Sequence, residues 1–236
     1  MESYKAFSKR IDYQKPELGV DNIYFQPDGR VYEKVKEDNR FKSFYGDTVV
    51  FDLDSKTKEK VFEIIEKLYD AVPECFCEKL IRDTIHMTLH DLSASDNLDK
   101  TAPEVFNNEI KLLQVIGDNP IKKQTIKMKT NYVINMIHTS LVLALCPADE
   151  KEWEKLARLY DLINQVKLCG YPFLTPHITL AYYNYNGFDV CSVQKLKKVV
   201  KELNKESFEI TLNTEKLVYQ KFTSMNNYIS IFNLLK

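Results

Sequence analysis

Apolar residues along the chain form short runs of two kinds, which predict its secondary structure. Alternating or continuous apolar runs bounded by turn residues predict β-strands, because successive strand side chains point to opposite faces. Such runs lie at residues 47–54, 84–92, 124–135, 139–146, 175–183, 207–213, 217–222 and 228–234, with a break near Asn131. Apolar residues three and four apart predict helices at residues 55–72, 103–116, 148–166 and 192–204.

The predicted elements repeat. Each half reads strand, helix, strand, helix, strand, and equivalent positions are 91 residues apart at His86 and His177 and 92 apart at Val49 and Leu141. We therefore expect an α+β, bilobal duplicated fold, in which two mostly antiparallel sheets face a central cleft with helices on the outside. The predicted domain covers residues 47–236, with halves of 47–137 and 138–236. Residues 1–46 read as an irregular extension, whose many aromatic side chains predict packing on the core.

Composition limits the class of protein. The chain has 236 residues, of which 44% are hydrophobic, and a formal net charge of −1, so it is not a generally basic nucleic-acid binder. Five cysteines, an odd number without a second close pair, favour reduced thiols: Cys75, Cys77, Cys146, Cys169 and Cys191. Without an apolar signal or spanning segment, we expect a cytoplasmic monomer, with no membrane contact and no obligate protein partner.

Polar side chains lie at alternate positions in two otherwise apolar strands. The first stretch is TIHMTLHDL, where His86 and Thr88 share a face, and the second is TPHITLAYY, where His177 and Thr179 do the same. A polar row on an inner strand is costly unless it has partners or borders a wet cleft. The similar HTS triplet at His138 falls in the predicted turn between the halves, so we leave it aside.

The two His-x-Thr pairs suit cleavage of a phosphodiester without a metal. Imidazole has an unperturbed pKa of about 6.5, so one histidine can accept a proton from the attacking oxygen while the other donates one to the leaving oxygen. The threonine hydroxyls can donate to the non-bridging phosphate oxygens, where charge develops. A single triplet is a weak signal, but two in equivalent places of a repeat favour function over a structural role.

The motifs HMTL and HITL, about ninety residues apart in a duplicated frame, resemble those of the 2H phosphoesterase superfamily. This superfamily includes the LigT-like RNA 2′,5′ ligases/phosphodiesterases and the cyclic phosphodiesterases. The resemblance covers residues 47–236 and implies that His86 and His177 are catalytic, that Thr88 and Thr179 hold phosphate, and that no metal or other cofactor is needed. The opening DGR…FYGDTVVFDL further resembles a less-studied bacterial branch.

One departure concerns the substrate. Some relatives have a basic residue shortly after the second motif, where this chain has AYYNYN.

Four further residues are candidates for substrate binding. His90 and Tyr183 are predicted to share the faces of the catalytic histidines, although a strand-end histidine and a core aromatic are equally ordinary interpretations. Lys127 and Lys129 alternate with apolar residues and would add positive charge to the cleft unless they face solvent.

The sequence therefore predicts a metal-independent phosphodiesterase acting on a nucleotide or RNA end, with a 2′,3′-cyclic phosphate or a 2′,5′ linkage. Three alternatives remain open at this stage. The chain could bind a nucleotide or RNA end without cleaving it, or hydrolyse a cyclic oligonucleotide signal. His86, His90 and His177 could instead bind a metal, although no positioned carboxylate cluster accompanies them.

Overall fold

A computed structural model of the chain describes residues 2–13, 18, 23–168, 170 and 173–235. Its helices are α1 (Tyr4–Tyr13), α2 (Ser55–Ala71), α3 (Leu98–Asp118), α4 (Glu150–Ile163) and α5 (Val190–Leu203). Its strands are β1 (Tyr45–Asp52), β2 (His86–Ser95), β3 (Thr125–Met136), β4 (Ser140–Pro147), β5 (His177–Tyr182), β6 (Glu209–Asn213), β7 (Leu217–Ser224) and β8 (Asn227–Asn233). The irregularity predicted near Asn131 is present as a register shift between Thr130 and Val133.

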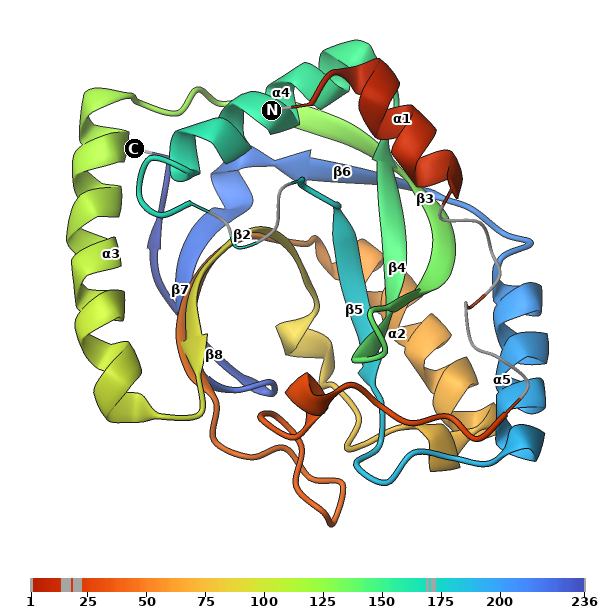
Figure 1. The fold of residues 1–236 in the computed structure, drawn as a ribbon. Helices are drawn as coiled ribbons and strands as arrows, with labels where there is room; N and C mark the ends of the chain where they lie inside the picture. The colour runs from red at the N-terminus through yellow and green to blue at the C-terminus, as the bar shows by residue number, and fades with distance from the viewer. Residues whose placement is uncertain (1, 14–17, 19–22, 169, 171–172, 236) are drawn as a thin grey trace.

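Two four-stranded antiparallel sheets form the framework, which confirms the predicted fold class (Figure 1). One sheet has the order β2-β1-β7-β8 and curls strongly, and the other has the order β5-β4-β3-β6. Each sheet takes strands from both halves of the sequence, because β3 joins the second sheet while β7 and β8 return to the first. The two histidine strands, β2 and β5, are edge strands of their own sheets, not central ones as the sequence predicted. They approach each other in the middle of the molecule.

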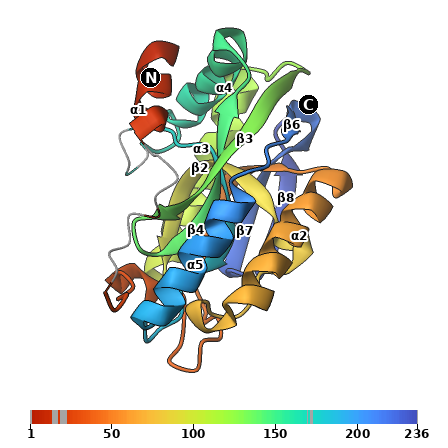
Figure 2. The same cartoon turned by 90° about the vertical axis from the view of Figure 1, so that its right-hand side faces the viewer.

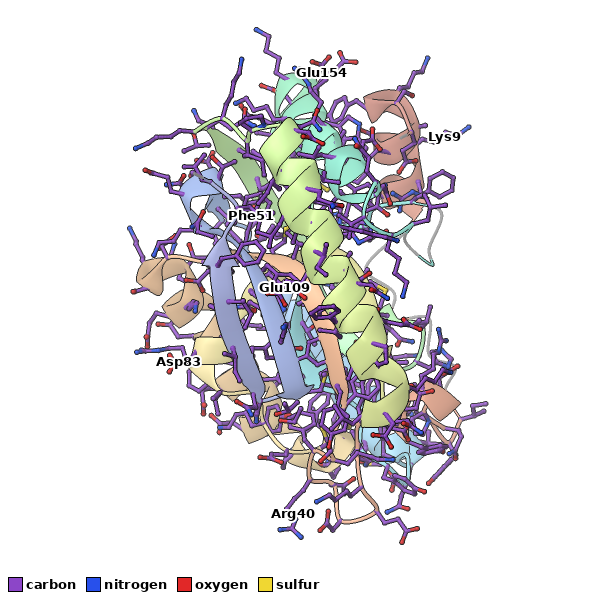
Figure 3. The ribbon with its side chains drawn as sticks, turned by 90° about the vertical axis from the view of Figure 1, so that its left-hand side faces the viewer. Lys9, Arg40, Phe51, Asp83, Glu109 and Glu154 are labelled. Carbon is purple, nitrogen blue, oxygen red and sulfur yellow. The ribbon has the colours of Figure 1, made fainter. Side chains whose placement is uncertain are left out.

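Helices cover the outer faces of both sheets. α2 and α5 lie side by side along one flank of the molecule (Figure 2). α3, which carries Glu109, crosses the outer face of the curled sheet (Figure 3). One continuous apolar core joins both sheets to these helices, with Phe51, Ile65, Leu141 and Leu196 among its fully buried members. The cleft faces of β2 and β5 are therefore held by a core on their opposite side.

The four helices that cover the sheets all begin behind a short polar side chain. Such a side chain accepts a hydrogen bond from a backbone N–H that has no partner in the first helical turn. The pairs are Asp54 with Thr57, Asn97 with Lys100, Asp149 with Glu152, and Asp189 with Ser192. Asn97 explains why α3 starts five residues before the predicted start at Pro103. This proline lies within the helix, which continues to Asp118.

The prediction of an irregular N-terminal extension is wrong for its first part, which forms the helix α1. Phe7 and Ile11 lie one turn apart and are buried, and the Phe7 ring stacks on that of Trp153 in α4 at a centroid distance of 4.2 Å. A ten-residue helix is marginal by itself, so this contact with a distant part of the chain stabilises it. The spacing of apolar residues in the N-terminal segment does not reveal this contact between Phe7 and Trp153.

Two further observations concern the predicted class of protein. No helix in the described part of the chain is long and apolar enough to cross a membrane. Cys75, Cys77 and Cys191 are free thiols, whereas Cys169 lies outside the described residues.

Candidate active site

A cavity of about 580 Å³ lies between the two sheets and is lined by both His-x-Thr pairs. His86 is the first residue of β2 and pairs with Asp52 of β1, and His177 is the first residue of β5 and pairs with Ala144 of β4. Along both strands the histidine and threonine are partly buried, while the residues between and after them are buried in the core. The structure thus brings together the four residues that the sequence predicted as catalytic.

Both histidines are held in the same way by the backbone before them. His177 Nδ1 lies 2.7 Å from the carbonyl oxygen of Thr175, and the backbone of Thr84 accepts a hydrogen bond from His86 in the equivalent place. A carbonyl oxygen only accepts, so Nδ1 of His177 carries a proton, and in the neutral imidazole its Nε2 has a free lone pair. Each histidine is thus oriented by a backbone contact that uses one ring nitrogen and leaves the other for chemistry.

Two tyrosines extend these pairs, and the sequence did not single them out. The Tyr228 ring packs edge-on against His86 at a centroid distance of 4.9 Å, which fixes the plane of the imidazole. The side chain of Tyr182 hydrogen-bonds to that of Thr179. Both tyrosines line the cavity, and burial raises the pKa of each phenol, so both stay neutral donors at neutral pH.

A β-bulge shifts the alternation at the same point of both histidine strands. In β2, Thr88 pairs with Val50 but His90 pairs with Val49, and in β5, Thr179 and Ala181 show the same shift. One extra residue changes which side chains face the cleft. As a result Asp91 and Tyr182, each five positions after its histidine, line the cleft. A spacing of five in both repeats is the sequence signal that could have found them.

The electrostatics of the cleft favour neutral histidines. Burial lowers the pKa of His86 to about 4, against the opposing influence of its bond to the Thr84 backbone and of the Asp91 carboxylate, while the charges of Lys58 and His177 lower it further. Burial also lowers the pKa of His177, again opposed by a backbone bond and by Asp91. Asp91 thus acts on both rings.

His90 borders the cavity, but its side chain is buried in the wall and hydrogen-bonded there. Only 1% of its surface is exposed, and its Nε2 donates to Asn164 Oδ1 at 2.9 Å. Its Nδ1 is buried without a hydrogen-bond partner among the described residues. The bulge after Thr88 explains this placement, because it rotates His90 away from the face on which His86 lies.

The other three predicted substrate contacts lie elsewhere. Tyr183 is fully buried outside the cavity lining, where its hydroxyl donates to Asn135 Oδ1 at 3.2 Å; the bulge in β5 places Tyr182 in the cleft instead. Lys127 and Lys129 are exposed on β3, also outside the lining, because the residues that alternate with them take the buried face. These three expectations are corrected by the structure.

No group of three or more His, Cys, Asp or Glu side chains is placed to hold a metal ion within the described ranges. His90 in particular directs Nε2 to Asn164 and not to the two histidines of the cleft.

The same architecture occurs in a conserved protein of unknown function from Agrobacterium tumefaciens. It is 14% identical, with a TM-score of 0.69, and the match covers 96% of this chain and 99% of that one. The two proteins share one fold. No protein-family model matches the sequence, and no curated protein matches it either.

Two more distant likenesses were found among solved structures. LigT from E. coli, complexed with 3′-AMP, is 15% identical with a TM-score of 0.48 over 80% of this chain and 96% of that one. A structure described as a phosphoesterase is 14% identical with a TM-score of 0.47 over 81% and 99% of the two chains. With TM-scores below 0.5, neither supports a conclusion about this chain.

Proposed function

We propose that the chain is a metal-independent phosphodiesterase of the 2H type, acting on a nucleotide or RNA end with a 2′,3′-cyclic phosphate or a 2′,5′ linkage. One observation carries this proposal. Two equivalent His-x-Thr pairs, from β2 and β5, line one cavity, and each histidine is hydrogen-bonded to the backbone of the residue two positions before it. Two bases and two hydroxyl donors that converge in this way suit in-line displacement at a phosphate.

The pKa relations support different roles for the two histidines. The positive charge of a protonated His177 lowers the pKa of His86, which favours the state with a proton on His177 and a neutral His86. We therefore assign His86 as the general base and His177 as the general acid. The neutral imidazole of His86 accepts the proton of the attacking water as its oxygen bonds to phosphorus. His177 acts in its imidazolium form, with Nδ1–H bonded to Thr175, and donates its Nε2 proton to the sugar oxygen as the bond from phosphorus to that oxygen breaks.

The threonine hydroxyls complete the proposed site. Thr88 and Thr179 donate to the two non-bridging oxygens, on which negative charge increases in the transition state. The bond between Tyr182 and Thr179 orients the second hydroxyl toward the cleft. Preorganised donors of this kind need no rearrangement during the reaction, so we expect their effect on kcat to exceed their effect on substrate binding.

The test is turnover of 2′,3′-cyclic mononucleotides, 2′,5′-linked dinucleotides and cyclic di- and trinucleotides in the presence of EDTA. His86→Ala and His177→Ala are measured beside the wild type, and His138→Ala is the matched control because that exposed histidine lies in the turn between β3 and β4. We expect cleavage by the wild type and the control, and a loss of at least about a hundredfold in kcat for each cleft variant.

Each contrary result has a distinct meaning. Cleavage that persists in the double variant His86→Ala, His177→Ala contradicts the two-histidine mechanism. Tight binding of one ligand without turnover by the wild type replaces the enzyme with a nucleotide-binding module. Cleavage confined to cyclic di- or trinucleotides keeps the mechanism and changes the substrate to a cyclic oligonucleotide.

A further inference from the structure

All lysine and arginine side chains in the described lining of the cavity come from the first 46 residues. They are Arg10, Arg30 and Lys34. Neither strand with a His-x-Thr pair supplies a permanent cation, although the proposed substrate is an anion. The N-terminal segment therefore determines the positive charge of this cleft.

Two of these three cations already have anionic partners. Arg10 forms an ion pair with Glu2 and donates to Thr175 Oγ1 at 2.9 Å. Arg30 Nε lies 2.6 Å from Asp28 Oδ1, and this contact lowers the pKa of Asp28 to about 2. Both guanidinium groups thus have a charge partner in the protein itself.

Lys34 differs from both arginines. Its Nζ has no hydrogen bond or ion pair with any residue that the structure describes, and it is only partly exposed. Its closest recorded contacts are two aromatic rings, at 5.2 Å from the centroid of Phe44 and 5.3 Å from that of Tyr182. Burial lowers the pKa of Lys34 and is the largest influence on it, although the carboxylates of Asp91 and Glu33 oppose it. An anionic group of a ligand would oppose this lowering in the same way.

The backbone holds Lys34 firmly in this position. Its N–H donates to Val31 at 2.9 Å, and its carbonyl oxygen accepts from the N–H of Lys42, also at 2.9 Å. Val31 and Val35, on either side, are fully buried. The ammonium group is therefore presented by a rigid turn of the chain, which lowers the entropic cost of binding an anion there.

Lys34 contacts the part of the cleft wall formed by Phe44 and Tyr182 and not the catalytic histidines. It is not among the groups that shift the pKa of His86 or His177, and it is connected to Thr179 only through Tyr182, whose side chain hydrogen-bonds to that of Thr179. Asp91 influences the pKa of all three side chains, and thus acts electrostatically on both catalytic histidines and on Lys34.

We propose that Lys34 binds a second phosphate of the substrate, so that the preferred substrate is a nucleotide with a phosphate group beyond the scissile phosphodiester. The proposal rests on the proposed function, because it takes the scissile phosphate to lie at the His-x-Thr pairs. Phe44 and Tyr182 form the walls of this subsite and hold the ammonium by cation–π contact until phosphate arrives. Lys34 is a specificity residue in this arrangement and takes no part in proton transfer.

The test compares substrates that share the scissile group. Adenosine 2′,3′-cyclic phosphate is measured with a 5′-hydroxyl, a 5′-phosphate and a 5′-diphosphate, and kcat/KM of the 5′-hydroxyl compound is the internal reference. The proteins are wild type, Lys34→Met, Lys34→Arg and the control Lys42→Met. Lys42 belongs to the same segment but lies outside the lining, bonded to Tyr32 O at 3.1 Å and paired with Asp96 at 3.4 Å.

We expect the wild type and Lys42→Met to prefer at least one 5′-phosphorylated substrate by about tenfold to a hundredfold, the usual range for a charge-assisted hydrogen bond. Lys34→Met should bring that ratio close to one, and Lys34→Arg should keep part of it. Methionine preserves the apolar stem, so an unchanged thermal midpoint excludes misfolding as the cause. A wild type without preference, or a ratio that survives in Lys34→Met, overturns the proposal.

A second readout separates this proposal from the catalytic one. Binding of adenosine 3′-phosphate and adenosine 3′,5′-bisphosphate is measured by calorimetry on the wild type and Lys34→Met. A preference for the bisphosphate that depends on Lys34, without turnover of any substrate, supports the subsite and removes the proposed activity. Turnover without such a preference in either readout supports the activity and removes the subsite.

Discussion

The imidazole of His86 should titrate far below the usual range of histidine in the ligand-free protein. Burial lowers its pKa from 6.5 to about 4, and the neighbouring charge of His177 contributes to the lowering. A difference of 2.5 units corresponds to about 3.4 kcal/mol between the two protonation states. If His86 is the general base, the acid limb of the kcat/KM profile should have its midpoint near pH 4, because that limb reports the free enzyme.

The lowered pKa of His86 also determines whether the free energy of unfolding rises or falls with pH. Between pH 4 and 6.5 the unfolded chain binds a proton at His86 and the folded protein does not, so the free energy of unfolding rises with pH. This contribution of about 3 kcal/mol is fully present above pH 6.5 and is lost as the pH falls through 4. The difference in unfolding free energy between the wild type and His86→Gln, measured in urea at each pH, should follow this curve.

Titration of labelled histidine side chains by NMR gives the direct test, with His86→Gln to assign the signal. Asp91→Asn is the informative second variant: it removes a charge that raises the pKa of both cleft histidines, so both titrations should move to lower pH. A His86 midpoint of 6 to 7 in the ligand-free protein would refute the reasoning, since the cleft would then be too wet to desolvate the ring. An unchanged midpoint in Asp91→Asn would show that the carboxylate points away.

Three further outcomes are expected. Thr88→Val and Thr179→Val should each lower kcat by about a hundredfold with little change in the unfolding midpoint, as for other lost transition-state donors; steady-state kinetics with less than a tenfold loss would contradict the roles given to these hydroxyls. Burial raises the pKa of Asp47 to about 6, so urea unfolding should show the wild type losing about 3 kcal/mol relative to Asp47→Asn as pH rises from 4 to 7. A pH-independent difference would place that carboxylate in water. Tyr183→Phe removes a hydrogen bond outside the cavity and should lower the free energy of unfolding by about 1 kcal/mol, while kcat/KM stays within about twofold. A large loss of kcat/KM would show that Tyr183 contributes to the active site.

The sequence predicted the central part of the site because that part depends only on local periodicity. His86 and Thr88 are two residues apart on a regular stretch of β2, so alternation places them on one face, and the same holds for His177 and Thr179. The apolar residues between them fixed which face would be buried. The two sheets and most helix positions followed from the same kind of local pattern.

Other parts of the site depend on contacts between distant segments, which a local pattern does not record. α1 is stabilised by the stack of Phe7 on Trp153, 146 residues later in the chain. Lys34 reaches the cleft because its segment packs against Tyr182, and the sequence predicted neither contact. The choice of Lys127 and Lys129 as cleft cations failed for a related reason, since a period of two does not say which sheet face is wet.

The bulges explain both the misplaced tyrosine and the asymmetry of the site. Because each histidine strand has one extra residue after its threonine, the residue five positions after the histidine lines the cleft, and it is Asp91 in one repeat and Tyr182 in the other. A duplicated frame would make the two histidines equivalent if these residues matched. Here one is a carboxylate that influences both rings, and the other is a phenol bonded to Thr179. Two chemically identical His-x-Thr pairs thereby receive unequal surroundings, which acid and base roles require.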